Sequence, residues 1–259
     1  MDYYEGGIDL DIDDLVIDGN GKTIDGGNKS RIFIVTGKNI TLRNIIFKNG
    51  YVFHNSDKFL NGEGGAIKAN HNTDLKIENC EFISNESEYE GGAISVSFSG
   101  LKIKESSFSK NKAEYGGAIY INNADVCIKE SLLNYNISSN YGGAIYCDKG
   151  KLNIIESTLN ENIGEWGGGA IYISNAELCI KESTLNGNSS LGRYKYKGAA
   201  IHNNKGSLTI SDSMLSGNST NEGGGAINNY EHNRFTESDC EFTNNRPKDI
   251  AFNNWSTIK

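Results

Sequence analysis

A Gly-Gly-Ala-Ile motif recurs along this chain and constrains its fold more than any other feature. The sixth copy reads Gly-Ala-Ala-Ile, and the steps between copies are 27, 25, 26, 26, 30 and 26 residues. Such a fixed period marks a repeat architecture, in which each unit covers its apolar face by stacking on a neighbour. We therefore expect one elongated domain. The copies begin at Gly64, Gly91, Gly116, Gly142, Gly168, Gly198 and Gly224.

A second motif keeps the same period. In it a Phe or Leu is followed three residues later by Asn, and an alternating apolar pair such as Leu101/Ile103 or Leu152/Ile154 lies upstream in six of the seven units. An apolar spacing of two between Gly and Asn positions is typical of short strands joined by turns. The recurring asparagines are Asn85, Asn111, Asn136, Asn162, Asn188, Asn218 and Asn245.

These patterns predict an all-β fold, a single right-handed parallel β-helix of about nine coils with roughly 26 residues per coil. The right-handed sense follows from the strong preference of parallel crossovers for that hand. We expect one domain over residues 1–259, with irregular coils in 1–62, regular coils in 63–245 and a tail in 246–259. The Gly pair supplies positive φ at a corner, and the Asn side chains form an amide ladder between coils.

The composition narrows the function. The chain has 259 residues and a net charge of −8, which disfavours a nucleic-acid partner because phosphate contacts need a basic face. It has no apolar run long enough for a transmembrane segment, and its first residues are acidic, so we expect no signal peptide in it. We expect no cofactor. The five cysteines do not fall in adjacent repeats of one column, which predicts free thiols.

The two motifs together resemble the repeats of the polymorphic outer membrane proteins of chlamydiae, and they are similar to adhesin-like β-helix proteins of methanogenic archaea. Residues 17–26, Ile-Asp-Gly-Asn-Gly-Lys-Thr-Ile-Asp-Gly, resemble the entry coil of such archaeal proteins. The resemblance covers roughly residues 12–250. It implies an extracellular or cell-surface protein with adhesion as its activity and a surface protein or glycan as its partner. We expect this sequence to depart from the family in lacking a signal peptide, an autotransporter barrel and an evident wall anchor, which leaves open a fragment of a larger surface protein or a cytoplasmic location.

Several β-helices are polysaccharide hydrolases or lyases, so an enzyme remains the alternative. Asn72-Thr73-Asp74 matches the first motif of polygalacturonases, but the paired Asp, Gly-His-Gly and Arg-Ile-Lys motifs are missing. A lyase needs clustered Asp residues for Ca²⁺ with a nearby basic residue, whereas Lys and Arg are scattered here. We therefore predict no enzymatic activity and assign no catalytic residue.

Two sets of acidic residues are candidate cation sites. Asp9, Asp11, Asp13 and Asp14 could chelate Ca²⁺, although the spacing is not that of an EF-hand. A column of five acidic residues would stack at about 4.8 Å and either hold a cation or form a solvated face screened by neighbouring lysines. The members of this column are Glu105, Glu130, Glu156, Glu182 and Asp212.

Aromatic residues form the strongest binding candidate. A column after the repeated Ile carries three tyrosines and His202, and further rings lie beside the Gly-Gly corner. We expect an exposed stripe that contacts a protein or glycan, or else stacked rings that only stabilise the strands. The longest repeat step adds a basic, aromatic loop over 191–197. The predicted contact residues are Tyr115, Tyr120, Tyr141, Tyr146, Trp166, Tyr172, Arg193, Tyr194 and Tyr196.

The sequence thus predicts a non-enzymatic adhesin-like β-helix module that binds a protein or glycan along an aromatic face. Two alternatives stay open, a carbohydrate-active enzyme with an unrecognised site and a structural spacer within a larger surface protein. The ligand and the oligomeric state are not determined by the sequence pattern.

Overall fold

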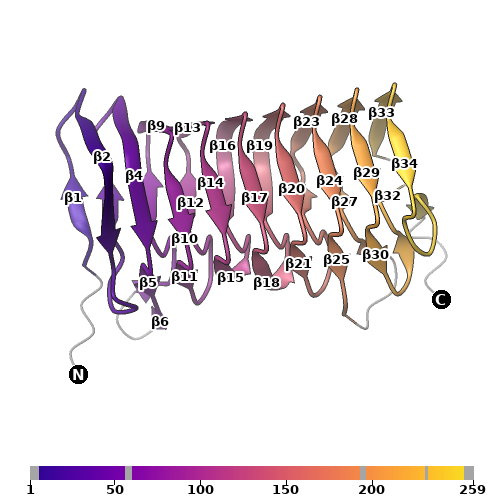
Figure 1. Ribbon diagram of the computed structural model, residues 1–259, viewed down its shortest axis with the longest axis horizontal. Helices are drawn as coiled ribbons and strands as arrows, with labels where there is room; N and C mark the ends of the chain where they lie inside the picture. The colour runs from indigo at the N-terminus through magenta and orange to yellow at the C-terminus, as the bar shows by residue number, and fades with distance from the viewer. Residues whose placement is uncertain (1–5, 56–59, 193–196, 231–232, 254–259) are drawn as a thin grey trace.

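The computed structural model describes residues 6–55, 60–192, 197–230 and 233–253. The chain winds into a β-solenoid of about nine turns that lie about 26 residues apart, with its strands side by side along one axis (Figure 1). Apart from one short hairpin, the paired strands are parallel. The predicted all-β parallel solenoid is confirmed, and the right-handed sense of the coil stays a prediction.

The first two faces of the coil belong to one 24-stranded sheet. Some strands bend around a corner and serve two faces. The first face contains β1 (Ile8–Leu10), β3 (Phe33–Val35), β8 (Ile67–Asn70), β12 (Ile94–Ser97), β22 (Ile171–Ser174), β27 (Ile201–Asn204), β32 (Ile227–Tyr230) and β35 (Ile250–Asn253). The second contains β9 (Asp74–Glu78), β13 (Gly100–Lys104), β23 (Glu177–Lys181), β28 (Ser207–Ser211) and β33 (Arg234–Ser238). Both faces share β16 (Ile119–Lys129) and β19 (Ile145–Ile155).

The third face continues the same sheet, and a separate seven-stranded sheet forms the fourth. The long strands β2 (Val16–Asp25) and β4 (Ile40–Lys48) bend from the second face into the third. The third face also contains β10 (Glu81–Ile83), β14 (Ser107–Ser109), β17 (Leu132–Asn134), β20 (Thr158–Asn160), β24 (Thr184–Asn186), β29 (Met214–Ser216) and β34 (Glu241–Thr243). The fourth contains β5 (Tyr51–Val52), β11 (Glu86–Ser87), β15 (Lys112–Tyr115), β18 (Ile137–Tyr141), β21 (Ile163–Gly164), β25 (Ser189–Ser190) and β30 (Ser219–Thr220).

Two short pairs lie outside these faces. β6 (His54–Asn55) and β7 (Leu60–Asn61) form the antiparallel hairpin, and β26 (Lys197–Gly198) pairs with β31 (Gly223–Gly224) in parallel.

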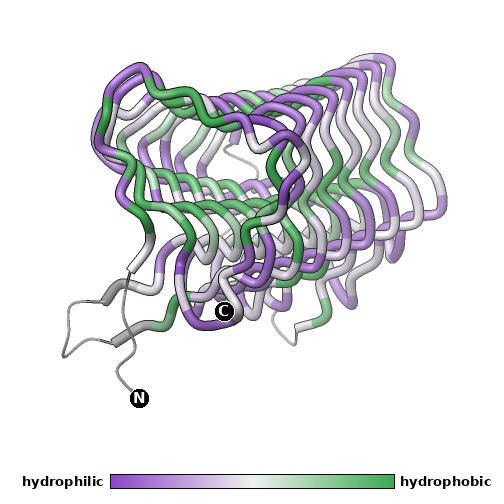
Figure 2. Tube along the Cα trace, turned by 60° about the vertical axis from the view of Figure 1, so that its left-hand side comes forward, coloured by the Kyte–Doolittle hydropathy of each residue, from purple (hydrophilic) through white to green (hydrophobic). Residues whose placement is uncertain are grey.

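The core lies inside the coil, where apolar segments of every turn face inward (Figure 2). Equivalent residues of successive turns are aligned in columns. The repeated Ile of one coil aligns with that of the next, as in Ile94, Ile119 and Ile145. In the column of the Asn motif, Phe82 stacks on Phe108 with ring centroids 4.5 Å apart and planes 2° apart. The parallel register places each inward side chain against one of similar type in the next coil, because every coil repeats the same inward positions.

The repeated asparagines form the predicted amide ladder. The Nδ2 of Asn136 donates to Oδ1 of Asn162 at 3.0 Å and to the carbonyl of Phe108 at 3.0 Å. Its own Oδ1 accepts from both the backbone N and the Nδ2 of Asn111, each at 3.0 Å. The side chain of Asn136 is fully buried, and the ladder ends where Asn245 donates to Asp249. Each buried amide therefore has its partners in neighbouring coils, as a dry interior requires.

Serine side chains form a second ladder, which the sequence pattern did not lead us to predict. Ser131 accepts from the backbone N of Ser106 and donates to the carbonyl of Lys129, and the pattern repeats in the following coils. Its signal was visible in the Lys-Glu-Ser motif at 104–106, 129–131 and 181–183.

The two glycines of the repeated motif have different tasks. The first is left-handed in the first five copies, as at Gly116 with φ of 64°, which agrees with the predicted corner, whereas Gly198 and Gly224 in the last two copies do not have a positive φ. The second allows close approach between coils, because a Cβ on Gly117 would lie 2.1 Å from the carbonyl oxygen of Gly143. The five cysteines are free thiols, as the column spacing predicted.

Candidate functional site

Four rings in successive coils stack on the outer surface of the first face. We call Tyr120, Tyr146, Tyr172 and His202 the inner aromatic row. Their rings are nearly parallel, with centroids 5.3, 5.2 and 4.8 Å apart along the row. The strand register places them in one column, because each follows the repeated Ile. Their spacing is set by the distance between neighbouring strands, so the row extends the sheet's own period outward.

A second row covers the first. Tyr89, Tyr115, Tyr141 and Trp166, the outer aromatic row, lie just before the Gly-Gly corner, where the chain turns from the fourth face to the first. Tyr115 packs edge-on against Tyr146 with ring centroids 5.4 Å apart. The ring centroids of Tyr141 and Tyr172 lie 4.4 Å apart. The two rows together form a small apolar layer outside the main core. Tyr89 was not among the residues that the sequence interpretation selected.

This layering corrects the expectation of a fully exposed stripe. Tyr120 and Tyr172 retain only 8% and 7% of their accessible surface, and Tyr146, Tyr115 and Tyr141 are half-buried. The sequence showed that these residues point away from the lumen, but it did not show that the next segment of chain folds over them. Trp166 keeps 37% of its surface and is the exposed end of the outer row.

Burial also shifts the pKa values of two tyrosines in the inner aromatic row and of a nearby glutamate. Desolvation raises the pKa of the Tyr120 and Tyr146 phenols above their usual range, and carboxylates nearby add to the effect. Desolvation and the charge of Glu63 raise the pKa of Glu90 to about 7, against a weaker opposing hydrogen bond from Tyr120. Lys68 forms an ion pair with Glu63 at 2.9 Å. The N-terminal end of the double row thus rests on a half-buried carboxyl that titrates near neutrality.

At the C-terminal end of the outer aromatic row, the ring of Trp166 lies beside the coil that contains the 30-residue repeat step. The backbone N of Gly192 donates to the carbonyl of Glu165 at 2.6 Å, which holds Leu191 and Gly192 next to the Trp166 segment. Leu191 is 57% exposed. We call Trp166 and Leu191 the apolar edge. The predicted contact residues Arg193, Tyr194 and Tyr196 lie outside the described residues.

The acidic column is a paired surface. The Nζ of Lys129 forms ion pairs with the carboxylates of Glu130 and Glu156, at N–O distances of 3.0 and 3.5 Å. The Nζ of Lys104 pairs with Glu105 at 2.9 Å. The five acidic residues share a left-handed corner, with φ between 49° and 51°. Lysines therefore screen the column along the corner, in agreement with the solvated-face interpretation.

Two of the four N-terminal acidic residues are bonded to groups of the next coil. Asp13 accepts from the backbone N of Lys38 at 2.8 Å, and Asp14 accepts from Nδ2 of Asn39 at 2.7 Å. Asp9 and Asp11 are exposed. Within the described residues, no group of three or more His, Cys, Asp or Glu side chains converges as a metal site. No described helix has the length and apolar composition needed to cross a membrane.

Comparison with known proteins identifies the repeat. Residues 105–122 and 130–148 match the model of the Chlamydia polymorphic membrane protein repeat. The two segments occupy equivalent places in consecutive coils, each running from the acidic corner through the Asn motif to the first-face strand. The expected resemblance to the chlamydial repeats is confirmed over these two segments, and the resemblance to the methanogen proteins stays a prediction. Searches of curated proteins and of solved structures returned no match.

Proposed function

We propose that the chain is a non-enzymatic, adhesin-like module displayed at a cell surface, where it binds a protein or glycan partner. The polymorphic membrane protein repeat supports the surface role, and the apolar edge beside the outer aromatic row is the contact that we assign to the partner. Adhesion needs no catalytic group. It needs a rigid scaffold that presents a contact surface, and a stacked solenoid provides one.

The observation that carries the proposal is the exposure of Trp166 on top of an ordered aromatic layer. Its ring packs edge-on against Tyr141 with centroids 5.9 Å apart, while 37% of the residue stays accessible to solvent. A large ring that is already held in place loses little conformational freedom when a partner covers it, which is why Trp is enriched among interface residues that dominate affinity. Leu191 extends the apolar contact into the neighbouring coil.

A cell-binding assay together with a glycan array tests this proposal. The variant pair Trp166→Ser and Leu191→Ser removes the apolar edge and leaves the buried inner aromatic row intact. We expect at least a tenfold loss of bound protein, because one well-packed interface Trp contributes about 2 kcal/mol or more.

A matched control removes similar apolar surface from another face. Leu132 and Tyr135 on the third face are 48% and 50% exposed, and Tyr135 has φ of 59°. Leu132→Ser with Tyr135→Asn should leave binding unchanged, since Asn suits the left-handed backbone. Equal loss in both variant pairs would contradict the assignment of the apolar edge, and absence of binding by the unmodified protein would favour the spacer alternative.

A further inference from the structure

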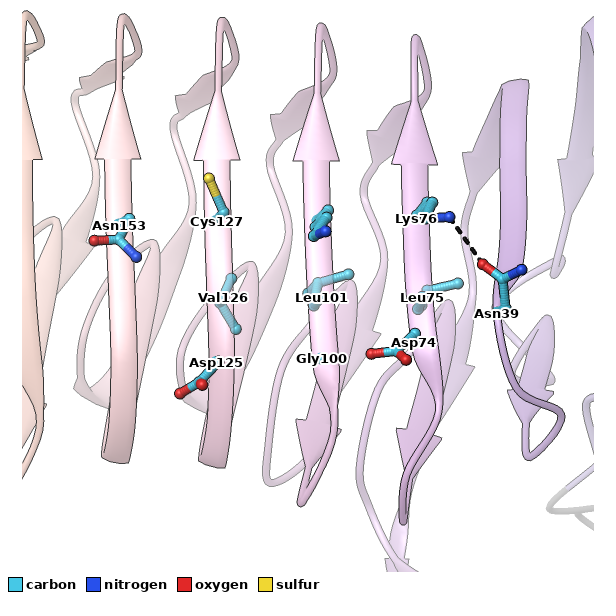
Figure 3. A pocket seen from close by; sticks show the side chains of 11 residues that line it. Asn39, Asp74, Leu75, Lys76, Gly100, Leu101, Asp125, Val126, Cys127 and Asn153 are labelled. Atoms are coloured by element: carbon cyan, nitrogen blue, oxygen red, sulfur yellow. Dashed lines mark hydrogen bonds between the residues drawn. The ribbon is translucent and has the colours of Figure 1, made fainter.

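A glycine interrupts the outward side chains of the second face and opens a hollow there. Gly100 lies in register between Asp74 and Asp125 on the neighbouring strands β9 and β16. Two adjoining depressions, of about 390 and 410 Å³, share these three residues. Figure 3 shows the two carboxylates on the strands that flank Gly100, and a Cβ on Gly100 would lie 2.6 Å from Oδ1 of Asp74. The carboxylate of Asp74 therefore leans over the gap left by the glycine.

The two carboxylates have no partner within the part of the chain that the structure describes. Among the described residues, neither the carboxylate of Asp74 nor that of Asp125 accepts a hydrogen bond or forms an ion pair, although the backbone N of Asp125 donates to the carbonyl of Ser99 at 3.2 Å. Further along the same row, Lys151 and Glu177 form an ion pair at 3.3 Å. Lys76 turns aside to donate to Asn39 at 2.8 Å (Figure 3). The acceptor groups around Gly100 are thus available to a ligand, whereas Lys151 and Glu177 on the following strands pair with each other.

An exposed aromatic ring forms another wall of the same hollow. Phe98 lines the 410 Å³ depression together with Asp74, Gly100 and Asp125. Its side chain is 49% exposed, and its ring stacks on His71 with centroids 5.7 Å apart and planes 6° apart. The equivalent corners of later coils carry Asn123, Lys149, Asn175 and Lys205. Phe98 therefore presents an apolar ring face at a place where the later coils present polar side chains.

The remaining lining residues supply hydrogen-bond donors as well as acceptors. Asn72 and Asn123 contribute amides, which can both donate and accept. The hydroxyls of Thr73 and Ser99 are bonded to each other at 2.5 Å, and Ser99 also donates to the carbonyl of Thr73, so these two groups serve the wall of the hollow. A cation would need acceptors only, whereas a neutral sugar offers hydroxyls that both donate and accept and a C–H face that packs on an aromatic ring. The volumes fall within the roughly 300–1,000 Å³ typical of small-ligand sites.

We propose that the hollow around Gly100 is a binding subsite for a neutral hexose unit. The ring of Phe98 packs against the C–H face of the sugar, and the carboxylates of Asp74 and Asp125 accept hydrogen bonds from its hydroxyls. Charged acceptors strengthen such bonds. The subsite lies on the second face and does not include Trp166 or Leu191. It is therefore independent of the partner contact proposed above, and the two proposals can be tested separately.

Saturation-transfer NMR with the intact protein tests the subsite, using glucose, galactose, mannose and N-acetylglucosamine at millimolar concentration as probes. We expect ring-proton signals from at least one sugar. Phe98→Asn and the double variant Asp74→Asn/Asp125→Asn should each weaken the signal at least tenfold. Gly100→Ala should weaken it too, since the added methyl group displaces the Asp74 carboxylate from the gap.

Two controls keep the test specific. Phe98→Asn places the residue type of two equivalent corners at φ of 55°, so its urea midpoint should not fall below that of the unmodified protein. Glu177→Gln and the Trp166→Ser/Leu191→Ser pair should retain the sugar signal. No signal from any of the four sugars, or an equal signal from Phe98→Asn, would overturn the subsite, as would a signal that only the Trp166 pair abolishes.

Discussion

The Asn ladder and the double aromatic row are both stacks of like side chains, yet they differ in extent and in position. The ladder runs through seven coils, lies inside the fold and has every amide partnered by its neighbours, from Asn85 to Asn245. The aromatic rows occupy only the middle coils and lie outside the sheet. The outer row also ends in a half-exposed ring, Trp166.

This difference teaches how to separate architecture from candidate function in a repeat protein. A column that persists in all coils is required by stacking, because one missing member leaves groups without partners in two neighbouring coils. A column that changes along the axis is free of that constraint. The substitution of Phe98 and Gly100 into otherwise polar columns is the same kind of local departure.

Breaking the ladder in its middle should have the largest effect. Asn136→Ala removes the acceptor of two Asn111 N–H groups and the donor to the carbonyl of Phe108. Oδ1 of Asn162 also loses the donor Nδ2 of Asn136 but keeps the backbone N of Asn136. The other three buried groups lose a partner at about 1–3 kcal/mol each, so we expect a loss of about 4 kcal/mol in the free energy of unfolding. Urea denaturation measures it. Asn153→Ala on the outer side of β19 is the control, and a similar loss there would show that the ladder has no special role.

Removing a ring from the inner aromatic row should cost less. Tyr146→Ala deletes two parallel stacks and the edge contact with Tyr115. Since the layer is thin and half-solvated, we expect about 2–3 kcal/mol rather than the larger cost of a core aromatic. Thermal or urea unfolding is the measurement, with the exposed Leu132→Ala as control. A loss as large as that of Asn136→Ala would show that the outer layer is as essential as the interior.

The smallest effect should come from the carboxyl beneath the rows. Because the folded-state pKa of Glu90 is raised from 4.5 to about 7, the folded state holds the proton more tightly and stability falls as pH rises through this interval. Glu90→Gln should flatten that fall and stabilise the protein by about 1–2 kcal/mol at pH 8. Unfolding at pH 5 and pH 8 measures this, with Glu81→Gln as charge-matched control. An unchanged pH dependence would contradict the assignment.

The sequence predicted the repeat, the parallel stacking, the Asn ladder and the free cysteines, because these follow from period, residue type and strand spacing. It placed Tyr120, Tyr146 and Tyr172 in one outward column correctly. It was wrong about their exposure, since the segment that carries Tyr115 and Tyr141 folds over the first face only when a whole coil is assembled. The sequence pattern did not indicate the hollow at Gly100 either, although Asn72-Thr73-Asp74 at its rim matches the first motif of polygalacturonases.

By itself, the sequence determined which residues share a column, because a constant period fixes alignment between coils whatever the shape of their cross-section. Only the tertiary structure decided which outward columns meet solvent. That depends on how the fourth face bends over the first, which brings Tyr115 onto Tyr146 and leaves 37% of Trp166 accessible to solvent. Register is a one-dimensional property of the chain, whereas burial depends on the path of the neighbouring segments in three dimensions.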